Sequence, residues 1–151
     1  MTSKELVLDT MKQYGRIVAK DIQEKSPNMT GTELYTQSTF IPDFKAACKV
    51  MNMLERPVGF VCKSSAGRVV KLVQVYDSTI YTQEPEELSA QWGFVWSTNP
   101  AHALPFVSIS TSPYNTGECC TENDKVYRSV IDNNIWAPSS YAEGWELVTI
   151  E

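Results

Sequence analysis

The pattern of apolar and polar positions divides the chain into a helical first third and a strand-forming remainder. Between residues 3 and 25, apolar side chains recur at steps of three and four, which is the period of an amphipathic helix with Ser3 as a candidate N-cap. The stripe consists of Leu6, Met11, Tyr14, Val18 and Ile22. Because a lone helix of this kind is marginal in water, we expect it to pack on the rest of the chain or to self-associate.

Two shorter helical segments follow the first helix. Thr30 and Glu33 have the spacing of a capping box, which predicts a helix that begins there and runs to about Thr36. The segment 40–44 interrupts it, and residues 45–54 predict one or two further helical turns. We therefore assign residues 1–54 to a helical N-terminal region.

From residue 57 the pattern becomes that of short strands. Residues 57–62 and 69–76 are rich in β-branched side chains and flank a turn at 64–67, which predicts a hairpin. Residues 91–96 predict a third strand after a polar loop. The segment 57–96 is thus expected to form a small three-stranded antiparallel unit.

The last third of the chain repeats this order. Residues 117–120, 126–132 and 144–148 predict three strands with the same succession of Gly, Cys, turn, valine-rich strand, loop and closing Trp. The expected fold class is α+β, with an N-terminal helical region followed by two small antiparallel three-stranded β units related by internal duplication. The second unit spans 105–151, and we expect Trp92 and Trp145 to occupy equivalent buried places.

Charge and hydropathy disfavour two classes of partner, nucleic acid and membrane. The formal net charge is −5, and residues 101–151 carry two basic and seven acidic side chains. Nucleic-acid binding requires a basic surface, so this class is disfavoured. The longest apolar run, 69–75, contains Lys71 and Gln74 and falls far short of the roughly 20 residues of a membrane helix. The first residues also lack the apolar stretch of a signal peptide.

The sequence offers little material for catalysis or metal binding. Its cysteines show no Cys-x-x-Cys pair, and its single histidine, His102, lies between alanines in a connector. We predict no metal, no cofactor and no enzymatic activity, with reduced thiols packed as small hydrophobes. Cys119 and Cys120 are adjacent in a predicted strand, so one is expected to face the core and the other the solvent.

The aromatic residues are concentrated in the β region. Eleven of sixteen lie at or beyond residue 76, and all four tryptophans lie beyond residue 91. They suit either a minimal core or a stacking surface for sugar rings. Trp92 and Trp145, which close the two units, are predicted core residues. Trp136 and Tyr141 lie in a polar loop without an amphipathic pattern, which makes them candidate contact residues.

Three segments of the second unit carry a resemblance to a known module. Residues 126–138, Tyr141 and residues 144–148 resemble the chitin-binding type 3 module of carbohydrate-binding families 5 and 12. The chain as a whole is similar to short Gram-positive prophage and phage tail-region proteins that place such a unit at the C-terminus. The first unit resembles the same pattern in a more degraded form, at residues 74–76 and 91–93.

This resemblance implies a non-enzymatic prophage-type protein that binds neutral glycans, since an acidic surface disfavours anionic ones. The alternative is a structural virion or tail-assembly component whose β units serve oligomerisation or docking. Expected partners are a cell-surface glycan, other phage structural proteins and further copies of the chain. The protein would be made in the bacterial cytoplasm and become virion-associated. The implied carbohydrate-binding residues are Tyr127, Asn133, Asn134, Trp136, Tyr141 and Trp145.

Overall fold

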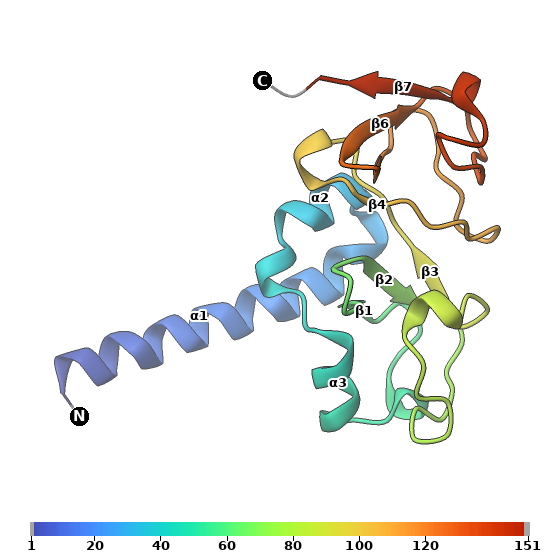
Figure 1. Ribbon diagram of the computed structural model, residues 1–151. Helices are drawn as coiled ribbons and strands as arrows, with labels where there is room; N and C mark the ends of the chain where they lie inside the picture. The colour runs from blue at the N-terminus through green and yellow to red at the C-terminus, as the bar shows by residue number, and fades with distance from the viewer. Residues whose placement is uncertain (1, 150–151) are drawn as a thin grey trace.

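A computed structural model describes residues 2–149 and places the helices where their sequence signals predict them (Figure 1). Helix α1 spans Ser3–Lys25 and is capped by Thr2 rather than Ser3, because the Thr2 hydroxyl accepts from the Glu5 amide at 3.1 Å. Helix α2 spans Gly31–Thr36 behind the predicted capping box, and α3 spans Phe44–Val50. Single 3-10 turns lie at Ser26–Asn28, Ser38–Phe40, Met53–Glu55, Pro85–Glu87, Pro100–His102 and Ala142–Gly144.

The remainder forms two sheets, which confirms the α+β class. The first sheet is antiparallel with the order β1-β2-β3, and the second is mixed with the order β4-β5-β6-β7. The prediction of a purely antiparallel, three-stranded second unit was wrong, because the connector before its hairpin lies parallel to β5 and adds a short strand, β4. The strands are β1 Val61–Lys63, β2 Val69–Leu72, β3 Trp92–Phe94, β4 Leu104–Pro105, β5 Cys119–Glu122, β6 Lys125–Ser129 and β7 Trp145–Val148.

The two hairpins are held by the same backbone hydrogen bonds. Gly59 donates to the Leu72 carbonyl at 2.7 Å, and Gly117 donates to the Ser129 carbonyl at 2.8 Å. Both glycines have left-handed backbone angles, with φ of 97° and 95°. The residue after each glycine accepts from that same Leu72 or Ser129 amide at 2.8 Å. Equivalent glycines therefore begin both units.

The closing tryptophans also occupy matching places. Trp92 pairs with Leu72 at the end of β2, and Trp145 pairs with Ser129 at the end of β6. Both rings are buried, as expected. A phenylalanine meets each indole edge-on, at 5.7 Å between the ring centroids for the first unit and 6.0 Å for the second. These phenylalanines are Phe44 and Phe106.

The first sheet reaches back into the segment that we assigned to the helical region. Lys63 donates to the Pro42 carbonyl at 2.8 Å, and Asp43 forms a parallel bridge with Lys63. In the second unit, β4 runs parallel to β5 in the corresponding place. Each hairpin is therefore flanked by the chain that precedes it.

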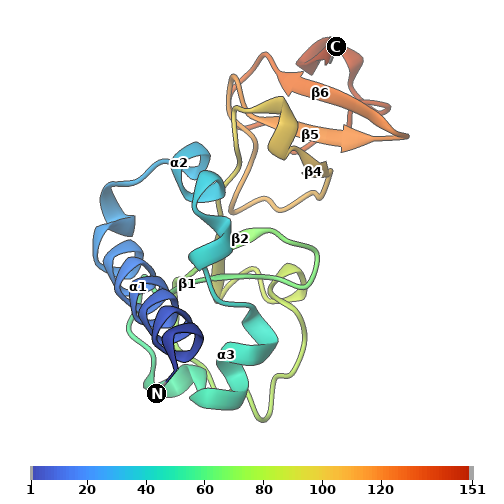
Figure 2. The ribbon, with the colours of Figure 1, turned by 90° about the vertical axis from the view of Figure 1, so that its left-hand side faces the viewer.

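One aromatic core joins the two units, which lie next to each other in Figure 2. Trp96 stacks on Tyr114 with 4.2 Å between ring centroids and an interplanar angle of 14°. Phe94 stacks on the far side of Trp96, and Phe106 stacks on Tyr114. Trp96 Nε1 also donates to the Ser112 carbonyl at 3.0 Å. The two units therefore share this aromatic core, and a second cluster, which includes Val61 and Val69, packs the first sheet against α1 and α2.

The prediction that Cys119 and Cys120 face opposite environments was wrong, because both side chains are buried. The connector after the first unit covers the Cys119 side chain, whose Sγ donates to the Thr98 carbonyl at 3.8 Å. Burial raises the pKa of Cys119 and raises the pKa of Cys120 to about 12. Both groups are therefore poor nucleophiles at neutral pH.

Among residues 2–149, no helix is long and apolar enough to cross a bilayer.

Candidate functional site: an aromatic hollow

The loop between β6 and β7 encloses a surface hollow of about 550 Å³. Its walls are the side chains of Ile131, Trp136, Ser140 and Tyr141. Trp136 is 48% exposed and Tyr141 is 38% exposed, although both are large aromatic residues. Their ring centroids lie 5.7 Å apart with an interplanar angle of 73°. The two rings therefore form adjoining walls of one open site.

Hydrogen bonds to the backbone hold this loop in shape. Trp145 Nε1 donates to the Trp136 carbonyl at 2.7 Å. The Ser140 and Tyr141 amides both donate to the Ala137 carbonyl at 2.9 Å, which turns the chain between the two rings. The buried Trp145 indole thus holds the Trp136 backbone against the protein, while the Trp136 ring remains exposed to solvent.

Gly144 makes room for the Tyr141 ring. A Cβ atom at this position would lie 2.9 Å from Tyr141 Cδ2 and 3.1 Å from Asn134 Nδ2, both closer than ordinary packing allows. A side chain at residue 144 would therefore push the Tyr141 ring from its place in the hollow.

Asn134 supports the loop from within. Its side chain is fully buried, and its amide nitrogen donates to Ser129 Oγ and to the Gly144 carbonyl, each at 3.1 Å. Its backbone also exchanges two hydrogen bonds with Tyr114. A buried polar group that satisfies its bonds inside the protein has none left for a ligand.

The other predicted site residues are divided between surface and interior. Asn133 is exposed, with a left-handed φ of 55°, and lies beside the loop. Tyr127 is partly buried against the aromatic core, and Trp145 is 7% exposed. The structure thus brings Trp136 and Tyr141 together at the hollow, whereas Asn134 and Trp145 form its scaffold.

Sequence reasoning missed two lining residues, Ile131 and Ser140. Ile131 lies two residues after the end of β6 and was predicted to be part of that strand, so its position at the mouth of the loop gave no separate signal. Ser140 precedes Tyr141 directly, and its only signal in the sequence is the polar composition of this loop.

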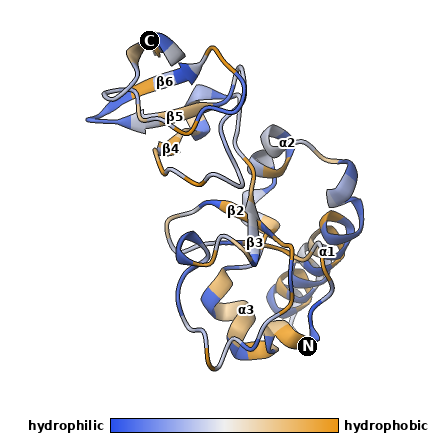
Figure 3. Cartoon of the chain, turned by 90° about the vertical axis from the view of Figure 1, so that its right-hand side faces the viewer, coloured by the Kyte–Doolittle hydropathy of each residue, from blue (hydrophilic) through white to orange (hydrophobic). Residues whose placement is uncertain are grey.

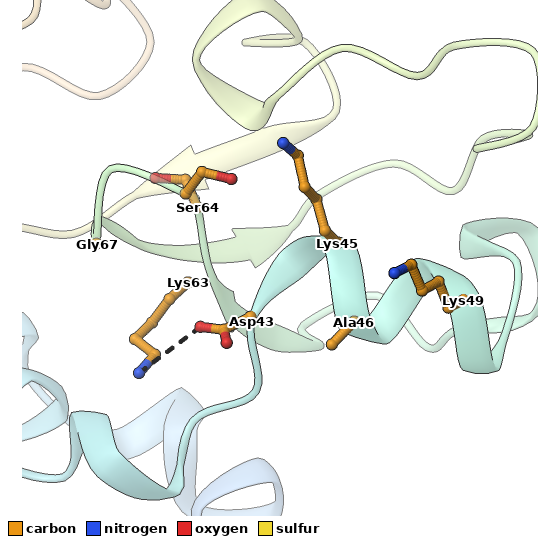
Figure 4. Close-up of a pocket in the computed structure, with 8 residues that line it drawn as sticks. Asp43, Lys45, Ala46, Lys49, Lys63, Ser64 and Gly67 are labelled. Atoms are coloured by element: carbon orange, nitrogen blue, oxygen red, sulfur yellow. Dashed lines mark ion pairs between the residues drawn. The ribbon is translucent and has the colours of Figure 1, made fainter.

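A second hollow, of about 500 Å³, lies beside α3 in the first half of the chain (Figure 4). Lys45, Lys49 and Lys63 line it, and Lys63 Nζ lies 3.9 Å from Asp43 Oδ1. Lys45 is 72% exposed and lies 3.9 Å from Glu84. Lys45 and Lys63 thus face carboxylates of the same chain, and the three lysine side chains do not converge on one point. Among residues 2–149, no group of three or more His, Cys, Asp or Glu could hold a metal ion.

No known family model, curated protein or solved structure matches this chain. The geometry of the aromatic hollow itself indicates what it can bind. It combines two ring faces, an aliphatic wall and a hydroxyl, and none of the lining residues within 2–149 is charged. Such a site can stack on an apolar ring face and hydrogen-bond at its rim.

Proposed function

We propose that the chain is a non-enzymatic binding protein that recognises a neutral glycan at the hollow formed by Trp136 and Tyr141. The observation that carries this proposal is the exposure of both rings at one site. Exposed aromatic rings cost hydration free energy and are favoured where a ligand covers them. The C–H face of a pyranose is apolar and fits a ring face of this kind.

The polar groups around the rings suit hydroxyl ligands. Ser140 lines the hollow, and Asn133 and Ser139 lie exposed in the same loop. Hydroxyl and amide side chains pair with sugar hydroxyls without burying a charge. The excess of acidic residues in 101–151 disfavours anionic glycans by repulsion. A neutral sugar is therefore the favoured class of ligand.

The proposed link to prophage proteins with chitin-binding type 3 modules rests on the sequence resemblance of residues 126–138, Tyr141 and 144–148, and the first unit would be a duplicate of the second. The matched glycines, the matched bonds to Leu72 and Ser129, and the two closing tryptophans support descent of both β units from one ancestor. Because only the second unit has the Trp136–Tyr141 pair, we place glycan binding there.

The test is retention of the full chain on insoluble chitin and on other neutral polysaccharides. We expect the wild-type chain to be retained with a Kd of about micromolar to millimolar, because a shallow site buries little area. Trp136→Ala should lose most of this retention. Tyr81→Ala removes a ring of similar exposure, 52%, in the first unit and serves as the matched control. Equal retention of wild type and Trp136→Ala, or no retention of wild type on any neutral polysaccharide, would contradict the proposal.

A second candidate function is a structural part of a virion or tail. The observation in its favour is the large exposed apolar surface of α1, which suits assembly more than ligand binding. Here the exposed rings of the second unit would contact other phage structural proteins. The retention experiment separates the two functions, because only the first predicts capture by a polysaccharide.

A further inference from the structure

The two rings of the aromatic hollow form a corner rather than a flat platform. The planes of Trp136 and Tyr141 meet at 73° with 5.7 Å between the ring centroids, which is an edge-to-face contact. A sugar that lies flat on one ring therefore meets the other ring at its side. A second sugar in the same plane has no ring face beneath it.

No other ring extends the corner into a row. Within residues 2–149, Trp136 and Tyr141 are the only exposed aromatic side chains of the second unit. Tyr127 is partly buried against the core, and Trp145 is buried. A surface that stacks on several coplanar sugars at once needs several coplanar exposed rings, so the described part of this unit is not such a surface.

Close packing favours the observed angle between the rings. The Tyr141 ring lies over Gly144, where an added Cβ would be 2.9 Å from Cδ2 and 3.1 Å from Cε2 of the ring. The Tyr141 amide donates to the Ala137 carbonyl at 2.9 Å, and the Trp136 amide donates to Asn134 Oδ1 at 3.3 Å. The corner is therefore built into the loop before any ligand arrives.

The remaining walls also suit one sugar. Ile131 and Ser140 complete the hollow, and its lining residues all come from the segment 131–141. Its volume of about 550 Å³ lies within the roughly 300–1,000 Å³ of sites that hold small molecules. Figure 3 shows the second unit at the end of the molecule opposite the N-terminus, so the helical region adds no wall. The corner alone thus bounds what a ligand can contact.

We propose that the hollow binds one sugar ring of a single, solvated glycan chain, and not the flat face of a crystalline polysaccharide. This inference rests on the proposed glycan binding and specifies the form of the ligand. One aromatic ring stacks on the apolar face of the sugar, the other ring and Ile131 contact its edge, and Ser140 hydrogen-bonds a hydroxyl. In a crystalline face, neighbouring chains cover the edges of each sugar and leave no room for the second ring.

The dependence of affinity on chain length separates a corner from a platform. The full chain is titrated with soluble N-acetylglucosamine and glucose oligomers, from dimer to hexamer, and binding is followed by calorimetry. We expect the Kd per sugar unit to change by less than about twofold along a series that binds, whereas stacking of a second sugar would improve it by roughly tenfold. A gain of that size with length would overturn the proposal.

The physical form of the polymer provides a second test. Amorphous chitin should retain the chain, and a soluble trimer should release it. Crystalline chitin, compared at equal accessible surface, should retain much less. Retention on the crystalline form that soluble oligomers do not reverse would overturn this inference and leave glycan binding intact. No binding to either form or to any oligomer would contradict glycan binding itself, and this inference with it.

Gly144→Ala alters the corner without removing either ring. Because the added methyl displaces Tyr141, the affinity for soluble oligomers should fall by roughly tenfold. Gly15→Ala, where the added methyl meets no neighbour, is the matched control and should bind as wild type does. Tyr141→Ala removes the second wall outright and should give a similar loss if Gly144→Ala fails to fold. An unchanged Kd in a folded variant of either kind would overturn the proposal.

Discussion

The closing tryptophans of the two β units bond to aromatic residues that differ in exposure. In the first unit, Trp92 Nε1 donates to the Tyr76 hydroxyl at 3.0 Å, and the Tyr76 ring is buried in the core. In the second unit, Trp145 Nε1 donates to the Trp136 backbone at 2.7 Å, and the Trp136 ring remains outside. A similarly packed closing tryptophan therefore accompanies a buried aromatic loop residue in one unit and an exposed one in the other. The difference lies in whether the indole bonds to a side chain or to the backbone.

The residue after the opening glycine also differs between the units. In the first it is Phe60, which is buried with the Arg56 guanidinium 4.4 Å above its ring. In the second it is Glu118, which accepts from the Asn115 amide at 2.6 Å. Burial raises the pKa of Glu118 above its ordinary value. The second unit thus carries a polar residue at a place where the first is apolar.

Removing either closing ring tests whether the two packing schemes are equivalent. We expect Trp92→Ala and Trp145→Ala each to lower the free energy of unfolding by about 3–5 kcal/mol, because each leaves a large cavity. Urea unfolding measures both, and the milder Trp→Phe changes serve if either variant fails to fold. A Trp145→Ala chain as stable as wild type would show that the second unit does not depend on its closing ring.

The opening glycines provide a finer test of the same equivalence. Gly59→Ala and Gly117→Ala should each cost about 1–3 kcal/mol, because alanine is strained at a left-handed φ. Neither added methyl meets a close neighbour, so backbone strain is the only cost. Gly15→Ala, in open space on α1, should instead be stabilising by about 0.5–1 kcal/mol. Strongly unequal costs at residues 59 and 117 would count against a shared ancestor.

The smallest expected effect is the pH dependence contributed by Glu118. Since the native pKa of this carboxyl is raised, the native state binds more protons than the unfolded state above about pH 4.5. Stability should therefore fall as the pH rises from there through the native pKa. Glu118→Gln should remove this part of the curve and gain stability relative to wild type at neutral pH. Unfolding curves at several pH values would contradict this if the variant and wild type kept the same slope.

The sequence predicted local structure well and long-range packing poorly. The period of α1 and the capping box at Thr30 are local signals, and both helices formed as expected. The pairing of Pro42 with β1 joins residues about 20 positions apart and left no local pattern. Burial of Cys119 depends on a connector that covers the strand, so alternation along the strand alone was misleading.

For the candidate site, too, the sequence predicted the loop but not the burial of each of its residues. The polar loop around Trp136 and Tyr141 was visible in the sequence, because rings without an amphipathic pattern stand out. The side chains of two adjacent asparagines, however, differ in solvent exposure. Asn133 is exposed, whereas Asn134 is fully buried in a network of hydrogen bonds. Their identical residue type gives no basis for predicting this difference in exposure. The left-handed backbone at Asn133 decides which of the two side chains points inward.

The most direct measurement of the central claim follows the four indole N–H signals by NMR while soluble N-acetylglucosamine oligomers are added. Three of these groups, on Trp92, Trp96 and Trp145, donate hydrogen bonds inside the protein. Trp136 alone among the tryptophans has an exposed ring. We predict that the Trp136 signal shifts with a saturable dependence on sugar concentration while the other three stay in place. Four unchanged signals, or shifts confined to Trp92 and Trp96, would contradict glycan recognition at the second β unit.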